Sequence, residues 1–209
     1  MSSPPIPGLL QRPLSEVLSA LASQHELAGG GGPAAALTAA AAAALTAKAA
    51  RGSRATWIEA GGAIAHAESL RMQAQALIER DAGAYRDASA ALLRSERSAR
   101  RGVAAPAVVT RSHADRERLV GEALTYAADV ALAIADASSE IAQLAADVAR
   151  NCPSSLRPDA LAAVALAEAA TCAAAQLVEV NRQLPADDRR RAASCEAAEA
   201  AQRARERAL

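Results

Sequence analysis

The chain has 209 residues, of which 52% are hydrophobic but only 1% are aromatic, and it contains no Phe. Basic and acidic residues number 23 each, so the sequence lacks the basic footprint of a nucleic-acid-binding protein. The cysteines form no Cys-x-x-Cys pair, which suits free thiols in the cytoplasm. We see no signal peptide, and the alanine-rich run at 34–50 is too weakly apolar to predict a membrane span.

With so few aromatic residues, the core must be built from Ala, Leu, Val and Ile. Small side chains let helix axes approach closely, and alanine favours helix over strand. Since no segment reads as a strand, we predict an all-α bundle of about six helices. Residues 1–12 are rich in proline and are expected to form an irregular arm, and residues 13–209 are expected to form one domain with its own core.

The first helix is predicted at about 13–25, where Leu14, Val17, Leu18 and Leu21 recur at helical spacing. Further helices are predicted at about 33–50, 56–93, 114–150, 158–184 and 185–209. The segment 95–112 is rich in Arg, Ser and Ala and contains Pro106, so we expect an exposed connection there.

The stretch that organises the chain is Gly29–Gly32 followed by Pro33, which fits the first position of a helix. The N-terminus of such a helix carries unpaired N–H groups and a partial positive charge, so it can hold an anion or a polar substrate atom. The alternative is a tight loop that lets two helices approach closely. Composition alone favours that alternative.

Three segments occur in order between about Leu14 and Leu184: LSEVLSALASQHELAGGGGPAAAL, ERDAGAY and RPDALAAVALAEAATCAAAQLVEVN. Together they resemble the cyclodeaminase/cyclohydrolase family, folate enzymes that act on formimino- or methenyl-tetrahydrofolate. The resemblance implies an all-helical fold, a homodimer and a folate cleft. A folate cleft would take a tetrahydrofolate derivative as a small-molecule substrate. We expect no bound cofactor and no metal, and charge and hydropathy predict no nucleic-acid or membrane partner.

The resemblance carries functional residues over by position. The family's glycine loop falls on Gly29–Gly32, its mid-chain motif on Asp81, Ala84 and Tyr85, its late aspartate on Asp159, and its terminal asparagine on Asn181. The candidate catalytic residues are therefore Asp159 and Asp81. The candidate ligand contacts are Gly30, Gly31, Gly32, Tyr85, Arg54 and Asn181.

The sequence also departs from the family pattern. A lysine-rich segment usually follows the alanine-rich helix and would suit the anionic tail of folate; here Arg51 and Arg54 supply only part of that charge. The residue before the late aspartate is Pro158 instead of Ser, and Gly83 replaces the acidic residue often found inside the mid-chain motif. These departures favour a substrate other than folate.

Methenyl-tetrahydrofolate carries a cationic amidinium carbon, so its hydrolysis needs a base and a carboxylate, whereas deaminative ring closure needs an acid. An aspartate at a helix start can serve either role once burial or a neighbour shifts its pKa, so Asp159 is the best candidate. We expect Asp81 and Asp159 to converge on the glycine stretch. Each candidate also has a structural alternative. Asp159 is a favourable helix-start residue, Tyr85 is expected to pack in the core, and Asn181 suits a helix end.

Three classes of function stay open. The chain is a folate-dependent cyclohydrolase or cyclodeaminase, or an enzyme on the same bundle with another small substrate, or a non-catalytic helical dimer that binds a partner. The charged segment at 189–206 would suit the third class. No spacing among His25, His66 and His113 indicates metal ligation.

Overall fold

The structure, a computed structural model, describes residues 8–23, 30–100, 106–180 and 187–209. In those residues the chain forms helices and no strand, which confirms the predicted all-α fold. The elements are the 3-10 helix η1 (Leu9–Gln11) and the α-helices α1 (Leu14–Ala22), α2 (Gly31–Gly52), α3 (Ala60–Arg100), α4 (Pro106–Asn151), α5 (Arg157–Glu179) and α6 (Arg189–Ala208). The division into an arm at 1–12 and one domain stays a prediction.

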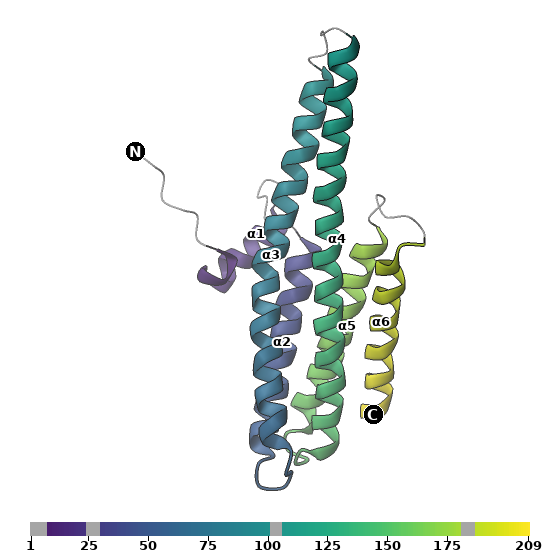
Figure 1. Cartoon of the computed structure of the whole chain (residues 1–209). Coiled ribbons are helices and arrows are strands. Elements are labelled where there is room, and N and C mark those ends of the chain that lie inside the picture. The colour runs from purple at the N-terminus through teal and green to yellow at the C-terminus, as the bar shows by residue number, and fades with distance from the viewer. Residues whose placement is uncertain (1–7, 24–29, 101–105, 181–186) are drawn as a thin grey trace.

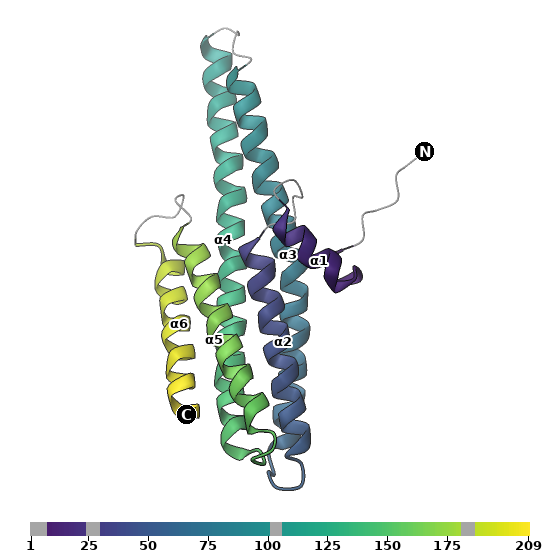
Figure 2. The ribbon, with the colours of Figure 1, turned by 180° about the vertical axis from the view of Figure 1, so that it is seen from behind.

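Helices α2 to α6 run alternately up and down, with their axes roughly parallel (Figure 1). Helices α3 and α4 are the longest, and their upper halves project beyond α2, α5 and α6 as a two-helix arm. The same projection is seen from behind in Figure 2, where α1 lies across the bundle near the start of α2. We use "arm" below for residues 85–100 of α3 and 106–126 of α4.

Alanine dominates the packed faces of the bundle. The largest core cluster joins α2, α3, α4, α5 and α6, and most of its members are alanines with almost no exposed surface. Because the hydrophobic faces carry so little bulk, neighbouring backbones come close. Buried hydroxyls are satisfied within their own helices: Thr46 donates to the carbonyl of Ala42, and Thr171 to that of Ala167. Among the residues that the structure describes, the buried side-chain polar atoms of the core all have a hydrogen-bond partner.

The predicted connection at 95–112 is wrong for most of its length. Helix α3 continues to Arg100, and α4 begins at Pro106. Arg, Ala and Glu are good helix formers, so a charged stretch extends the helix without any apolar face to bury. Pro106 begins a helix instead of interrupting one, because the first N–H of a helix has no partner to lose.

Other helix ends differ from the prediction by a few residues. Helix α2 begins at Gly31, so Pro33 lies within the first turn, where proline is still tolerated. Helix α5 ends at Glu179. Helix α6 begins at Arg189 because Asp188 caps it, accepting a hydrogen bond from the Arg190 backbone N–H at 2.8 Å.

Two described helices, α2 and α5, are long and apolar enough to cross a membrane by length and composition. In this fold 61% of the apolar window of α2 and 44% of that of α5 is buried inside the bundle. A core helix of a soluble protein passes the same test, so these two helices are weak evidence for a membrane location.

The alanine packing can be tested with two neighbouring residues of α2. Ala43 is fully buried, whereas Ala44 is exposed. Changing Ala43 to Leu is expected to lower the free energy of unfolding by about 1–3 kcal/mol, because the added carbons have no space. The matched change Ala44→Leu is expected to stay within about 0.5 kcal/mol of the parent. Urea denaturation measures both, and equal tolerance of the two changes would contradict this packing.

Candidate functional site

The N-terminus of α2 and the carboxyl group of Asp81 on α3 lie against each other. Gly30 precedes the helix, and the Ala34 N–H donates the first helical hydrogen bond to its carbonyl at 3.3 Å. Gly32 is buried, and a Cβ on it would overlap the carboxyl carbon and both oxygens of Asp81. Glycine at position 32 is therefore what allows Asp81 to lie directly on the first turn of α2.

The Asp81 carboxyl is held in a partly buried environment. Burial raises the pKa of Asp81 from 3.8 to about 6, because the charged form loses contact with water. Within the described residues the carboxyl has no hydrogen bond or ion pair that would offset this loss. The nearby helix N-terminus favours the carboxylate form to a smaller extent. Asp81 can therefore take up or release a proton close to neutral pH.

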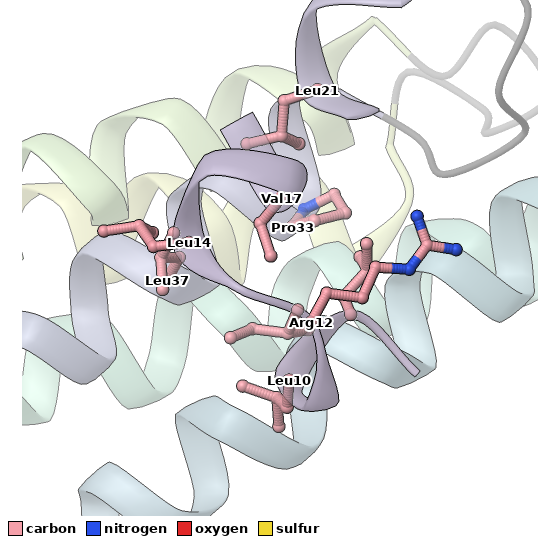
Figure 3. Close-up of a pocket in the computed structure, with 9 residues that line it drawn as sticks. Leu10, Arg12, Leu14, Val17, Leu21, Pro33 and Leu37 are labelled. Carbon is pink, nitrogen blue, oxygen red and sulfur yellow. The ribbon is translucent and has the colours of Figure 1, made fainter. Parts of the chain in front are cut away.

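An apolar pocket of about 170 Å³ adjoins this turn. Figure 3 shows its walls: Leu14, Val17 and Leu21 come from α1, Leu10 from η1, and Pro33 and Leu37 from α2. The Arg12 guanidinium extends away from these side chains. Pro33 directly follows Gly32, and the lining residue Ile78 lies one helical turn before Asp81. The pocket and the carboxyl therefore share the same end of α2.

The sequence prediction missed this pocket, because its outer wall comes from the segment assigned to the N-terminal arm. Leu9 is buried, and the Leu10 N–H donates to Glu79 Oε1 at 2.9 Å, which fastens η1 to α3. Gly8 lies close to the same carboxylate. The available signal was the apolar pair Leu9–Leu10 beside the proline-rich stretch.

Tyr85 lies one turn beyond Asp81 on α3, at the base of the arm, and 47% of its surface is exposed. The expectation that Tyr85 packs in the core is wrong for a single chain, because the arm leaves the bundle at this level. Asp81 and Tyr85 do share a helix face, as their spacing of four residues predicts.

Asp159 lies elsewhere. It occupies the first turn of α5, where its Oδ2 pairs with Lys48 Nζ of α2 at 2.6 Å. Lys48 is near the C-terminal end of α2, about 24 Å along the helix from Gly32. The expected convergence of Asp81 and Asp159 on the glycine stretch is therefore wrong within one chain. The two residues were assigned to one pocket because a sequence match does not show at which end of a helix each motif falls.

Arg54 is exposed in the turn between α2 and α3, at the same end of the bundle as Asp159. Gly30 and Gly31 lie at the start of α2, as predicted. Gly29 and Asn181 lie outside the described residues. Among the residues that the structure describes, no group of three His, Cys, Asp or Glu side chains is arranged to hold a metal ion.

The contact between Gly32 and Asp81 predicts a difference between two neighbouring glycines. In Gly32→Ala the methyl group is expected to displace the Asp81 carboxyl toward solvent, so that its pKa returns from about 6 toward 3.8. A Cβ on Gly30 meets no atom within 4 Å, so Gly30→Ala should leave that pKa unchanged. NMR titration of the Asp81 carboxyl carbon measures both. An unchanged pKa in Gly32→Ala would show that the close contact does not exist.

Comparison with known proteins now identifies the family. The chain is similar in fold to the crystal structure of formiminotetrahydrofolate cyclodeaminase from Thermotoga maritima, with a TM-score of 0.75 and 18% sequence identity. That similarity covers 96% of this chain and 95% of the other. No curated protein sequence matches the chain. Residues 13–200 match the family described as formiminotransferase-cyclodeaminase. This range includes both the Gly32 turn and Asp81. The chain belongs to the formiminotransferase-cyclodeaminase family.

Proposed function

We propose that the chain is a folate one-carbon enzyme that acts on methenyl- or formimino-tetrahydrofolate, with Asp81 as its acid–base residue. The observation that carries the proposal is the Asp81 carboxyl on the first turn of α2, with its pKa raised to about 6. Membership of the family and the fold it shares with a formiminotetrahydrofolate cyclodeaminase support the folate class of substrate.

One carboxyl of this pKa suits either reaction. In methenyl hydrolysis water adds to the cationic amidinium carbon, and the Asp81 carboxylate accepts the proton that the water loses. The same negative charge stabilises the cationic substrate. One C–N bond of the adduct then breaks: protonated Asp81 returns its proton to the leaving folate nitrogen, and the hydroxyl proton of the adduct goes to solvent as the formyl C=O forms. In deaminative closure the folate nitrogen attacks the formimino carbon, and protonated Asp81 donates its proton to the departing ammonia. Burial keeps part of the Asp81 population protonated near neutral pH, so both forms are available.

The adjoining apolar pocket supports a ligand with a flat apolar part. Its volume of about 170 Å³ is close to that of cavities that hold one six-membered ring. We place one ring of the substrate between α1 and the start of α2, with the reacting carbon beside the Asp81 carboxyl. The N–H groups of Gly30 and Gly31 are then near the polar atoms of the ligand. Tyr85 is one turn farther along α3 and completes the same face.

A second candidate is an enzyme of this fold with a substrate other than folate. The ion pairs near the end of α2 favour this candidate. Lys48 is paired with Asp159 and Arg51 with Glu68, so both cations already have an anionic partner other than a folate tail. These pairs leave Arg54 as the exposed arginine of that turn that could meet the anionic tail of a folate. The two candidates share the Asp81 site and differ in the substrate.

The test is the decay of methenyl-tetrahydrofolate, and of the formimino derivative, with and without the protein. Asp81→Asn is expected to lower kcat/KM by about 100-fold or more, because Asn cannot transfer a proton. If Asp81 is the base, kcat/KM rises as the pH passes through about 6 and the carboxylate forms. If Asp81 is the acid, kcat/KM falls over the same range.

The matched control is Asp159→Asn, which removes a carboxylate at the other end of α2. Its turnover should stay within about threefold of the parent, since a solvent-exposed ion pair contributes little to folding. Loss of turnover in Asp159→Asn alone would place the chemistry at that end of the bundle. Absence of turnover on both folates would leave the second candidate.

We also propose that the protein is a homodimer in the cytoplasm. The arm carries exposed apolar side chains that no other described element covers: Tyr85, Leu92, Leu93, Leu119 and Tyr126. Such a concentration on one projecting element is typical of an interface. Three free cysteines suit a reducing compartment. A second subunit on the arm would also cover the Asp81 face beside Tyr85.

The dimer is tested by changing Leu93 and Leu119 to Glu together. These charges are expected to convert the dimer into a monomer, because burying an unpaired carboxylate at an interface is costly. Ile58→Glu is the control, since Ile58 is 99% exposed in the turn at the opposite end of the bundle. Sedimentation velocity measures the mass of each variant. A monomeric parent protein, or a double variant that is still dimeric, would contradict the arm as the interface.

A further inference from the structure

A second cavity lies between the start of α3 and the end of α4, at the lower end of the bundle in Figure 1. It is a groove of about 400 Å³, within the range of small-molecule sites. Its floor is apolar and comes from Ala63 and Leu144, which belong to or pack against the main core. Along α3 the groove is about 28 Å from Asp81, so it is separate from the proposed folate site.

One wall of the groove is the indole of Trp57, the single tryptophan of the chain. Trp57 is half-buried, and its ring packs against the main core. Its backbone N–H donates to the carbonyl of Ser53 at 2.9 Å, and the fully buried Ser53 hydroxyl donates to Ala49 at 2.8 Å. The backbone of Trp57 is therefore held in a hydrogen-bonded turn beside the groove, and an indole is a side chain on which a flat ligand can stack.

The rim of the groove is polar and presents mainly acceptors. Asp147 Oδ1 is paired with Arg150 at 2.6 Å, which leaves Oδ2 for a ligand. The carboxylate of Glu59 has no ion pair or hydrogen bond within the described residues. The ring of His66 is turned toward Glu140, with 2.7 Å between Nε2 and Oε1. A ligand with paired N–H donors would satisfy a free carboxylate with two parallel hydrogen bonds.

Gly62 lines the groove and has no side chain, which leaves space for a ligand. A Cβ built on Gly62 meets no atom within 4 Å, so the wall is open at this point of α3. The neighbouring Gly61 is equally free of contacts but does not line the groove. Both glycines lie in the first turn of α3, and glycine favours a helix less than alanine does. The chain thus keeps a helix-weakening residue where a side chain would fill the groove.

We propose that this groove binds a planar heterocycle with an amino-lactam edge, such as guanine, stacked on Trp57 with its N–H donors on a rim carboxylate. The indole supplies the stacking surface, Ala63 and Leu144 the apolar floor, and Glu59 the paired acceptors. The site stands independently of the folate chemistry at Asp81.

The test uses guanosine as the probe and Trp57 fluorescence as the readout, since no other tryptophan contributes to the signal. Guanosine is expected to quench the fluorescence in a saturable titration. Inosine lacks the 2-amino group and is expected to bind about tenfold more weakly, because it loses one of two parallel hydrogen bonds. Non-saturable quenching, or equal affinity for the two nucleosides, would overturn the proposal.

Two variants locate the binding. Gly62→Leu should fill the groove and weaken guanosine binding by about tenfold or more, whereas Gly61→Leu should leave it within about twofold. Both changes favour helix, so thermal melts are expected to be equal to or above that of the parent. Asp81→Asn should not alter guanosine binding. If Gly61→Leu weakens binding as much as Gly62→Leu, or if Asp81→Asn abolishes it, the probe binds elsewhere and the proposal fails.

Discussion

The close approach of helix backbones is the constraint on which this structure depends. Alanine at the contacts between α2, α4 and α5 removes the bulk that normally separates helix axes. At Gly32 the backbone of α2 is in direct contact with a side chain of α3, because even a methyl group would overlap the carboxyl of Asp81. A core of ordinary leucines would push α3 away from the start of α2 and open the site to water. The small residues therefore determine both the packing and the environment of Asp81.

That environment accounts for the chemistry proposed for the site. An exposed aspartate is fully ionised at neutral pH and is a poor proton donor. Partial burial against α2 brings the pKa of Asp81 to about 6, and no charged neighbour among the described residues holds the carboxyl in one state. Asp159 shows the contrast: it is exposed enough to pair with Lys48 and serves to join α2 to α5. The two aspartates therefore differ in what they can do.

The fold could be predicted from the sequence, because alanine-rich segments at helical spacing leave few alternatives. The placement of Asp81 beside the glycine stretch was also predicted, through the order of the family motifs. The end of the bundle at which Asp159 lies could not be predicted, since a motif gives no direction along a helix axis. The pocket formed with Leu10 was missed because its wall comes from a 3-10 turn in a proline-rich stretch. Helix propensity, which extends α3 through its charged residues to Arg100, outweighed the loop-like composition of that segment.

The pocket beside Asp81 and the groove beside Trp57 are separated along the length of the bundle. Helix α3 carries Gly62 near its start and Asp81 near its middle, so each cavity uses a different stretch of the same rigid element. Since α4 runs antiparallel to α3 along both, a ligand at one end has no direct contact with the other. A path between them runs along α3 and its contact with α2, where alanines leave little freedom for a side chain to change its rotamer. The geometry therefore favours two sites that bind their ligands independently over a pair that communicates.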